Sequence, residues 1–125
     1  RGALAGPRVV QRIGVHPPSR SPARQTLPWS AQTIEVIREG MAAVVKRPDG
    51  TGFRAYTPVV SIAGKTGTAQ THVPEHTHGS FIGFCPVEEP RAAFAILAEY
   101  GGSGGDLPAE IARTICEYVS APGTL

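Results

Sequence analysis

The sequence is short of the features that assign a chain to a membrane or nucleic-acid class. It contains no apolar run long enough to cross a bilayer and no signal peptide. Because it begins with Arg1 rather than methionine, we expect any anchor of a longer parent protein to lie outside these 125 residues. Residues 1–29 carry five arginines and no acidic residue, but no aromatic side chains are interleaved with them to stack on bases. We therefore predict no nucleic-acid partner.

Cysteine is also scarce. Cys85 and Cys116 are the two cysteines of the chain, and their separation matches no metal-binding or redox motif. Two interpretations stay open: they are small core residues, or they form a disulfide if the second half of the chain folds so that they meet. They do not settle the cellular compartment.

Histidines gather in one predicted loop, where His72, His76 and His78 lie near Glu75. This spacing invites comparison with a metal site, but Pro74 would break any helix there and no cysteine joins the group. Loops often contain histidines without binding metal. We predict no metal ligand among them and no cofactor for the chain.

The densest polar chemistry lies in residues 62–70. Apolar residues lead into this stretch, which predicts a β-strand over about residues 59–71. Since side chains alternate along a strand, Thr66 and Thr68 should share one face, and Lys65 and Gly67 the other. Two hydroxyls on one face can bind a carboxylate or a peptide. An ordinary surface strand remains the alternative, whereas a phosphate-binding loop is excluded because Val59 stands where that loop needs glycine.

The sequence Gly-Lys-Thr-Gly-Thr-Ala-Gln at residues 64–70 resembles the third active-site motif of the penicillin-binding proteins. Further similarities are Gly-Pro-Arg-Val-Val at 6–10 and Phe-Ile-Gly-Phe-Cys-Pro at 81–86, although Gly79 and Ser80 replace a common aromatic position. The chain is thus identified as a member of the class B penicillin-binding proteins, as the C-terminal part of a transpeptidase domain. The resemblance extends from about Gly6 to Val119.

The other elements follow from local patterns. A short strand is expected within residues 7–15, followed by a proline-rich loop over 16–28. Ser30 should cap a helix that ends near Lys46. Residues 53–56 should form a short helical piece or an irregular link. Two antiparallel strands are predicted at 80–85 and 91–100, both well covered, and a final helix should begin at Asp106 with Ile111, Ile115, Tyr118 and Val119 as its apolar stripe.

These elements predict an α+β fold, with an antiparallel sheet flanked by helices, and the resemblance implies a β-lactamase/transpeptidase-like partial domain. Hydrophobic residues make up 41% of the chain, enough for a core. We divide it into a Pro/Arg-rich segment, 1–29, and the transpeptidase part, 30–125. The family fold places the Lys-Thr-Gly strand at the edge of the sheet, where an extended peptide can add as another strand.

The resemblance also implies the chemistry. A peptidoglycan D,D-transpeptidase cross-links cell-wall stem peptides through a serine acyl-enzyme and is trapped by β-lactams. By motif position, Lys65 supplies positive charge beside the proton-transfer network. The hydroxyls of Thr66 and Thr68 bind the substrate carboxylate, and Gly67 permits close approach. The backbone N–H of Thr68 completes the oxyanion hole.

The other motifs of the family, Ser-x-x-Lys and Ser-x-Asn, are missing from the sequence. We expect them to precede Arg1 in a longer parent, so the chain by itself should be inactive. Alternatives are a β-lactam sensor domain, a D,D-carboxypeptidase or β-lactamase-like hydrolase, and a degenerate relative kept for binding. The implied setting is the extracytoplasmic, periplasmic face of the bacterial membrane, with a membrane glycan polymerase as a candidate partner of the parent protein.

Overall fold

The computed structural model describes residues 3–5, 15, 24–121 and 123, and the chain divides into two compact units, 1–36 and 37–125. In the first unit, β1 (Ala3–Ala5) pairs antiparallel with β2 (Arg24–Thr26). The expected loop over 16–28 is therefore wrong at residues 24–26, because backbone pairing with β1 makes this segment a strand. The strand expected within 7–15 lies outside the described residues, Val15 excepted.

Helix α1 (Ala31–Lys46) begins where the sequence predicts. The Ser30 hydroxyl accepts a hydrogen bond from the Thr33 backbone N–H at 3.0 Å, which satisfies one of the free donors of the first turn. Along this helix Val45 is buried, while Ile37 is 44% exposed. The helix is followed by a turn and by the 3-10 helix η1 (Phe53–Ala55), which confirms the short helical piece.

Gly40 provides a stability prediction within α1. A Cβ built on Gly40 would meet nothing within 4 Å, so Gly40→Ala should stabilise the helix by about 1 kcal/mol through reduced backbone entropy in the unfolded chain. Urea unfolding monitored by circular dichroism measures the change. Gly50→Ala is the matched control and should destabilise, since its Cβ would lie 2.3 Å from the carbonyl oxygen of Val44. Similar shifts in both variants would contradict this account.

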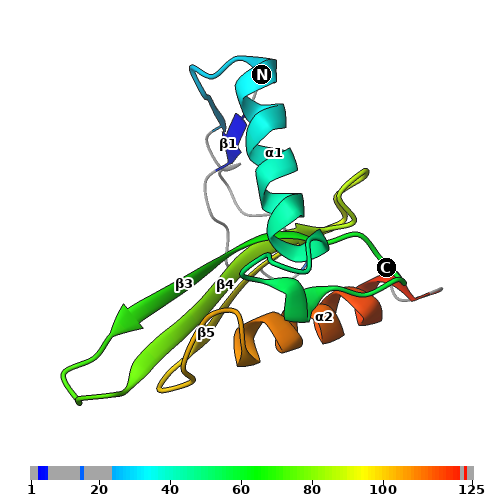
Figure 1. Cartoon of the computed structure of the whole chain (residues 1–125). Helices are drawn as coiled ribbons and strands as arrows, with labels where there is room; N and C mark the ends of the chain where they lie inside the picture. Colours follow the sequence, from blue (N-terminus) through cyan, green and yellow to red (C-terminus); the bar gives the residue numbers. More distant parts are fainter. Residues whose placement is uncertain (1–2, 6–14, 16–23, 122, 124–125) are drawn as a thin grey trace. The chain divides into compact units, whose positions relative to one another are not determined.

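The second unit is built on a three-stranded antiparallel sheet in the order β3-β4-β5 (Figure 1). The strands are β3 (Ala63–Gln70), β4 (Thr77–Cys85) and β5 (Ala92–Ala98). Both antiparallel pairings confirm the prediction from sequence. The register sets Thr66 opposite Phe81 and Phe81 opposite Ile96, so these three side chains share one face.

Helix α2 (Leu107–Ser120) runs along one face of the sheet and contacts β4, β5 and η1 (Figure 1). Its buried residues are Pro108, Ala109, Ala112 and Cys116. The predicted stripe was wrong for Tyr118, which is 70% exposed. The helix turns its small residues to the sheet, because small side chains let a helix approach strand side chains closely and leave the larger ones at the margins.

The start of α2 differs from the expected cap. Asp106 occupies the N-cap position, but its side chain makes no capping hydrogen bond. Its carboxylate lies 3.3 Å from Nε of Arg54, and the same guanidinium contacts Glu110 at 2.8 Å. The hydrogen bond to Glu110, followed by the charges of Asp106 and Glu110, raises the pKa of Arg54 above its usual range. This exposed ion-pair cluster joins η1 to the first turn of α2.

Within the second unit, no described element covers the opposite face of the sheet. Ile82 is 52% exposed and Leu97 is 67% exposed, and burial alternates along β5. The expectation that the strands at 80–85 and 91–100 are both well covered is thus wrong for this face of the sheet. Continuous apolar residues in a strand indicate that both of its faces are covered. In the second unit, α2 packs on one face of β4 and β5, and the described residues of that unit leave the other face exposed.

Phe81 stands at the centre of the covered face. It is fully buried, and its ring stacks on Phe94 with centroids 5.9 Å apart. A Cβ on Gly64 would lie 2.3 Å from Cε1 of Phe81, so only glycine fits beside the ring at that position. Gly64, the first glycine of the motif, therefore leaves room for the Phe81 ring of the neighbouring strand β4.

Candidate active site

The motif strand lies where a substrate strand could reach it. β3 is an outer strand of the sheet within the described residues, paired with β4 alone. Thr66 and Thr68 share one face, and Lys65 and Gly67 the other, as the alternation predicts. Lys65, opposite Ile82, stands on the uncovered face, whereas the threonines stand on the face that bears α2.

The Lys65 side chain bends to the margin of the strand. Its Nζ donates a 2.6 Å hydrogen bond to the backbone oxygen of Thr66. Since the N–H and C=O of one residue in an antiparallel pair point to the same side, the reach of Lys65 to this oxygen indicates that Thr66 presents its backbone to the open edge. Thr68, two residues on, then presents its own N–H to the same edge. Cationic and backbone groups thus converge on one margin of β3.

The hydroxyls of Thr66 and Thr68 have partners in segments that the sequence analysis did not predict to be near the motif strand. Thr66 Oγ1 is 2.9 Å from Thr51 Oγ1, in the turn after α1. The Gly104 backbone N–H approaches Thr68 Oγ1 at 3.4 Å, a long and weak hydrogen bond. The Thr68 side chain remains exposed, so its hydroxyl is available to a further partner.

The glycine-rich segment 101–105 packs directly on the motif strand. A Cβ on Gly104 would lie 2.4 Å from the carbonyl oxygen of Gly67 and 2.1 Å from that of Ser80. A Cβ on Gly67 would in turn meet Ser80 Oγ at 2.5 Å. No local pattern in the sequence indicates the contact of this segment with β3. Glycine at 104 allows backbone to lie against backbone beside the predicted oxyanion donor.

The histidines occupy the far end of the β3–β4 hairpin. His78 and His76 both pack edge-on against Tyr100, with ring centroids 5.0 Å and 5.9 Å away, and the Tyr100 N–H donates to His78 Nδ1 at 3.0 Å. Among the described residues, no three histidine, cysteine, aspartate or glutamate side chains gather closely enough to hold a metal ion. These rings pack the end of the sheet.

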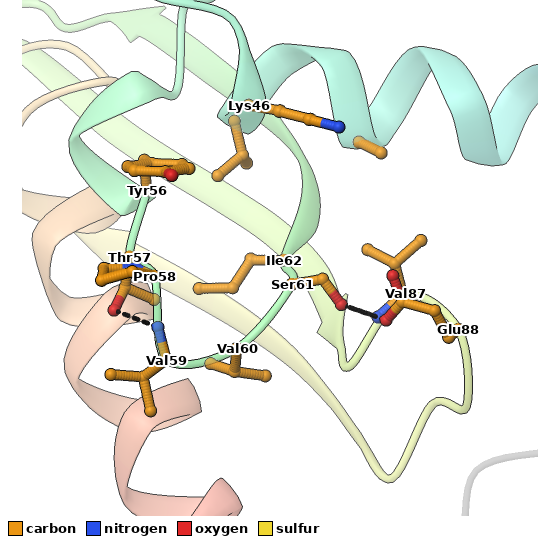
Figure 2. A pocket seen from close by; sticks show the side chains of 12 residues that line it. Lys46, Tyr56, Thr57, Pro58, Val59, Val60, Ser61, Ile62, Val87 and Glu88 are labelled. Atoms are coloured by element: carbon orange, nitrogen blue, oxygen red, sulfur yellow. Dashed lines mark hydrogen bonds between the residues drawn. The ribbon is translucent and has the colours of Figure 1, made fainter.

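A cavity of about 440 Å³ lies away from the motif, and none of its lining residues belongs to 64–70. Figure 2 shows its mostly apolar wall from residues 56–62, with Lys46 and Glu88 also lining it. Ser61 connects two sides: its hydroxyl accepts from the Val87 N–H at 2.9 Å and donates to Glu88 Oε2. Because the cavity lies apart from residues 64–70, we assign it no substrate.

The Ser61–Glu88 contact gives a prediction on acidity. The hydrogen bond from Ser61 is the main cause that lowers the pKa of Glu88, so Ser61→Ala should raise it toward the usual glutamate value. Because this carboxyl has a depressed pKa in the folded state, its contribution to stability is present above the unfolded pKa and is lost as pH falls. Carboxyl-detected NMR titration measures the shift. Ser61→Thr keeps the hydroxyl and should leave the pKa low; an unchanged pKa in Ser61→Ala would contradict the assignment.

Comparison with known proteins agrees with this architecture. The family model "Penicillin binding protein transpeptidase domain" matches residues 1–117. The chain belongs to the penicillin-binding protein transpeptidase family. Within this family it is 35% identical over 96 residues to the peptidoglycan D,D-transpeptidase MrdA of Acinetobacter baumannii, an alignment that covers 66% of this chain and 14% of that protein.

Solved structures of the family superpose on the chain. The D,D-transpeptidase domain of a peptidoglycan glycosyltransferase from Eggerthella lenta matches with a TM-score of 0.67 and 32% identity, covering 86% of this chain and 24% of that one. Penicillin-binding protein A from M. tuberculosis, as an imipenem acyl-enzyme complex, matches with a TM-score of 0.62 and 32% identity, covering 78% and 21%. The α+β fold class with its antiparallel sheet is confirmed. This chain spans roughly a seventh to a quarter of the length of these relatives.

Neither α1 nor α2, the two α-helices of the described residues, combines the length and apolar character needed to span a bilayer.

Proposed function

We propose that this chain forms the substrate-binding edge of a peptidoglycan D,D-transpeptidase that cross-links stem peptides through a serine acyl-enzyme and binds β-lactams. One observation carries the proposal: an ammonium and outward backbone groups lie at the free margin of β3, and two threonine hydroxyls stand on one face of the same strand. Relatives named as D,D-transpeptidases, and one solved as an imipenem acyl-enzyme, support the same reaction.

The margin suits an extended peptide that ends in a carboxylate. The unpaired backbone of β3 can pair with the stem peptide as an added strand. Thr66 and Thr68 then offer hydroxyls to the terminal carboxylate of the substrate, and Lys65 neutralises negative charge beside it. β-Lactams carry a carboxylate beside the reactive amide and use the same groups.

Acyl transfer needs an oxyanion hole and a nucleophile. The backbone N–H of Thr68 is one donor, aimed from the edge toward the carbonyl oxygen that becomes negative in the tetrahedral intermediate. The nucleophilic serine of a Ser-x-x-Lys motif attacks the D-Ala–D-Ala carbonyl and expels D-alanine. An amine of a neighbouring stem then takes the acyl group and frees the serine. Gly67 leaves the strand surface open for this approach.

We infer that the nucleophile comes from sequence outside this chain, as part of the same parent protein. The sequence holds no Ser-x-x-Lys and no Ser-x-Asn. The sheet face beside Lys65 is apolar and uncovered by described residues, with Ile82 52% exposed and Leu97 67% exposed. A segment of the parent protein that packs on this face and brings the serine to Lys65 would bury its apolar side chains. Such burial stabilises the assembled domain by about 25 cal/mol per Å² of apolar surface. We propose that residues 30–125 form the C-terminal part of the domain and that residues 1–29 form a Pro/Arg-rich segment before it.

The proposed reaction sets the location and partners. Peptidoglycan is made outside the cytoplasm, so the parent protein works on the extracytoplasmic, periplasmic face of the membrane. Its substrates are stem peptides and its inhibitors are β-lactams. The Eggerthella lenta relative is the transpeptidase domain of a peptidoglycan glycosyltransferase, which supports a glycan polymerase as a working neighbour.

A labelling experiment tests the function. The longer parent protein, incubated with a fluorescent penicillin, should gain one covalent label, and with a stem-peptide substrate and an amine acceptor it should form cross-linked product. The 125-residue chain alone should gain no label. A label without any turnover of stem peptide would indicate a sensor, and product formed only with water would indicate a carboxypeptidase or β-lactamase. A parent that takes no label would overturn the proposal, and labelling of the chain alone would overturn its incompleteness.

A further inference from the structure

The hydroxyl of Thr66 has a neighbour that lies outside the Lys-Thr-Gly motif. Oγ1 of Thr66 is 2.9 Å from Oγ1 of Thr51, which belongs to the turn after α1. The two residues are 15 positions apart in the sequence. Either hydroxyl can donate to the other in the structure, which contains no ligand. The proposed reaction does not use Thr51.

The backbone on both sides of Thr51 is packed tightly. The Gly52 N–H donates a 3.0 Å hydrogen bond to the backbone oxygen of Val44 at the end of α1. A Cβ on Gly50 would lie 2.3 Å from that same oxygen. A Cβ on Gly52 would lie 2.8 Å from Cε2 of Phe81, in the core. Both neighbours of Thr51 are therefore held close to surfaces that admit only glycine, and this fixes the position from which the Thr51 side chain leaves the turn.

The glycine-rich segment 101–105 packs on Thr51 as well as on the motif strand. A Cβ on Gly105 would lie 2.2 Å from the backbone oxygen of Thr51. The preceding residue, Gly104, directs its N–H to Oγ1 of Thr68 at 3.4 Å. One segment thus contacts both Thr51 and the second hydroxyl of the motif. Thr51 is part of the framework around the two threonine hydroxyls.

A bound carboxylate would fix the direction of the hydrogen bond between Thr51 and Thr66. An ionised carboxylate only accepts hydrogen bonds, so Thr66 has to give its one hydroxyl proton to the ligand. The proton between the two threonine oxygens then has to come from Thr51. In the resulting chain Thr51 donates to Thr66, Thr66 donates to the carboxylate, and each hydrogen bond polarises the next.

We propose that Thr51 is a positioning residue of the substrate carboxylate site, which orients the Thr66 hydroxyl toward the ligand without contacting the ligand itself. The inference rests on the proposed function, in which Thr66 binds that carboxylate. By occupying one lone pair of the Thr66 oxygen, the Thr51 hydroxyl turns the Thr66 proton outward. The ligands that gain from this are those with an ionised carboxylate, namely stem peptides that end in D-alanine and β-lactams.

Thr51→Val in the longer parent protein tests the proposal, because valine keeps the branched shape and loses the hydroxyl. The second-order rate constant of acylation is measured with a penicillin that has its free carboxylate and with the methyl ester of the same penicillin. The free carboxylate should react about 5-fold more slowly with Thr51→Val than with the wild type, as expected for one lost hydrogen bond. The rates with the methyl ester should agree within about 2-fold, since the ester has no ionised group for the chain of hydroxyls to stabilise.

Two variants serve as controls. Thr51→Ser keeps the hydroxyl and should acylate at the wild-type rate with both ligands. Thr114→Val makes the same change of hydroxyl to methyl on α2, where the hydroxyl donates to the Glu110 backbone oxygen, and it should leave both rates unchanged. A disturbance of the turn by valine would slow the two ligands equally, so the ratio of the two rates distinguishes orientation of Thr66 from a structural effect.

A double variant distinguishes positioning from direct contact. Thr66→Val removes the donor to the carboxylate, so adding Thr51→Val to it should cause no further loss of rate. Independent losses from the two substitutions would mean that Thr51 contacts the ligand directly, and they would overturn the proposal. Equal slowing of both ligands by Thr51→Val, or no slowing of either, would overturn it too. A wild-type parent that takes no label would instead overturn the proposed function, and this inference with it.

Discussion

Lys65→Ala in the parent protein is expected to slow acylation by penicillin by about 10²–10³-fold. The ammonium of Lys65 is the positive charge at the margin of β3, where it already donates to the backbone oxygen of Thr66. Its loss removes charge stabilisation from the substrate carboxylate and from the proton transfer of the attacking serine. Stopped-flow labelling with a fluorescent penicillin gives the rate constant.

Two control variants distinguish the loss of the Lys65 charge from a general effect of the substitution on folding. Lys46→Ala removes an exposed lysine of α1 that lines the separate cavity, and its acylation rate should equal that of the wild type. Lys65→Arg keeps the charge but not the compact ammonium, so it should recover part of the rate. Equal acylation rates for Lys65→Ala and Lys46→Ala would contradict a role for Lys65 in the reaction.

Phe81→Ala should destabilise the second unit by about 3–5 kcal/mol, a large share of a typical domain stability. The ring is fully buried, stacks on Phe94 and fills the space beside Gly64 and Gly52. Those glycines have no side chain to move into the void, so the cavity would persist. Urea unfolding of the 125-residue chain, monitored by circular dichroism, measures the loss.

The matched variant for this effect is Tyr118→Ala. Tyr118 is also a large aromatic residue, but it is 70% exposed on α2, so its removal should change stability by no more than about 0.5 kcal/mol. Should Phe81→Ala leave no measurable folded state, Phe81→Leu fills more of the cavity and should show a smaller, measurable loss. Equal midpoints for Phe81→Ala and Tyr118→Ala would mean that the ring is not the centre of the core.

Much of the fold follows from local patterns in the sequence. The Ser30 cap predicted the start of α1, and the period-two alternation predicted the faces of Thr66, Thr68 and Lys65. The α+β class followed from the predicted elements, whereas the edge position of the motif strand came from the resemblance carried by residues 64–70. The roles of Lys65, Thr66, Gly67 and Thr68 stay predictions, since they depend on a bound substrate.

The remainder depended on contacts between distant residues. Nothing local indicates that Gly104 rests against Gly67, or that Thr51 meets Thr66 across 15 positions. The pattern on α2 misled for a similar reason: Tyr118 has the right spacing for the apolar stripe, but Ala109, Ala112 and Cys116 fit the close approach to the sheet. The periodicity of apolar residues identifies which face of a helix is buried. The surface that the helix packs against, here the sheet, determines which side chains of that face become buried.

The bare face of the sheet also governs how this chain behaves in solution. Ile82 of the central strand β4 and Leu97 of β5 face outward, and β3 and β5 are the outer strands of this sheet within the described residues. Such margins template pairing between copies, and salt strengthens the attraction between apolar surfaces. A stock of the isolated chain should therefore scatter more light as its concentration or the sulfate content increases. Low concentration, together with a charged substitution such as Leu97→Lys, is expected to keep it monomeric.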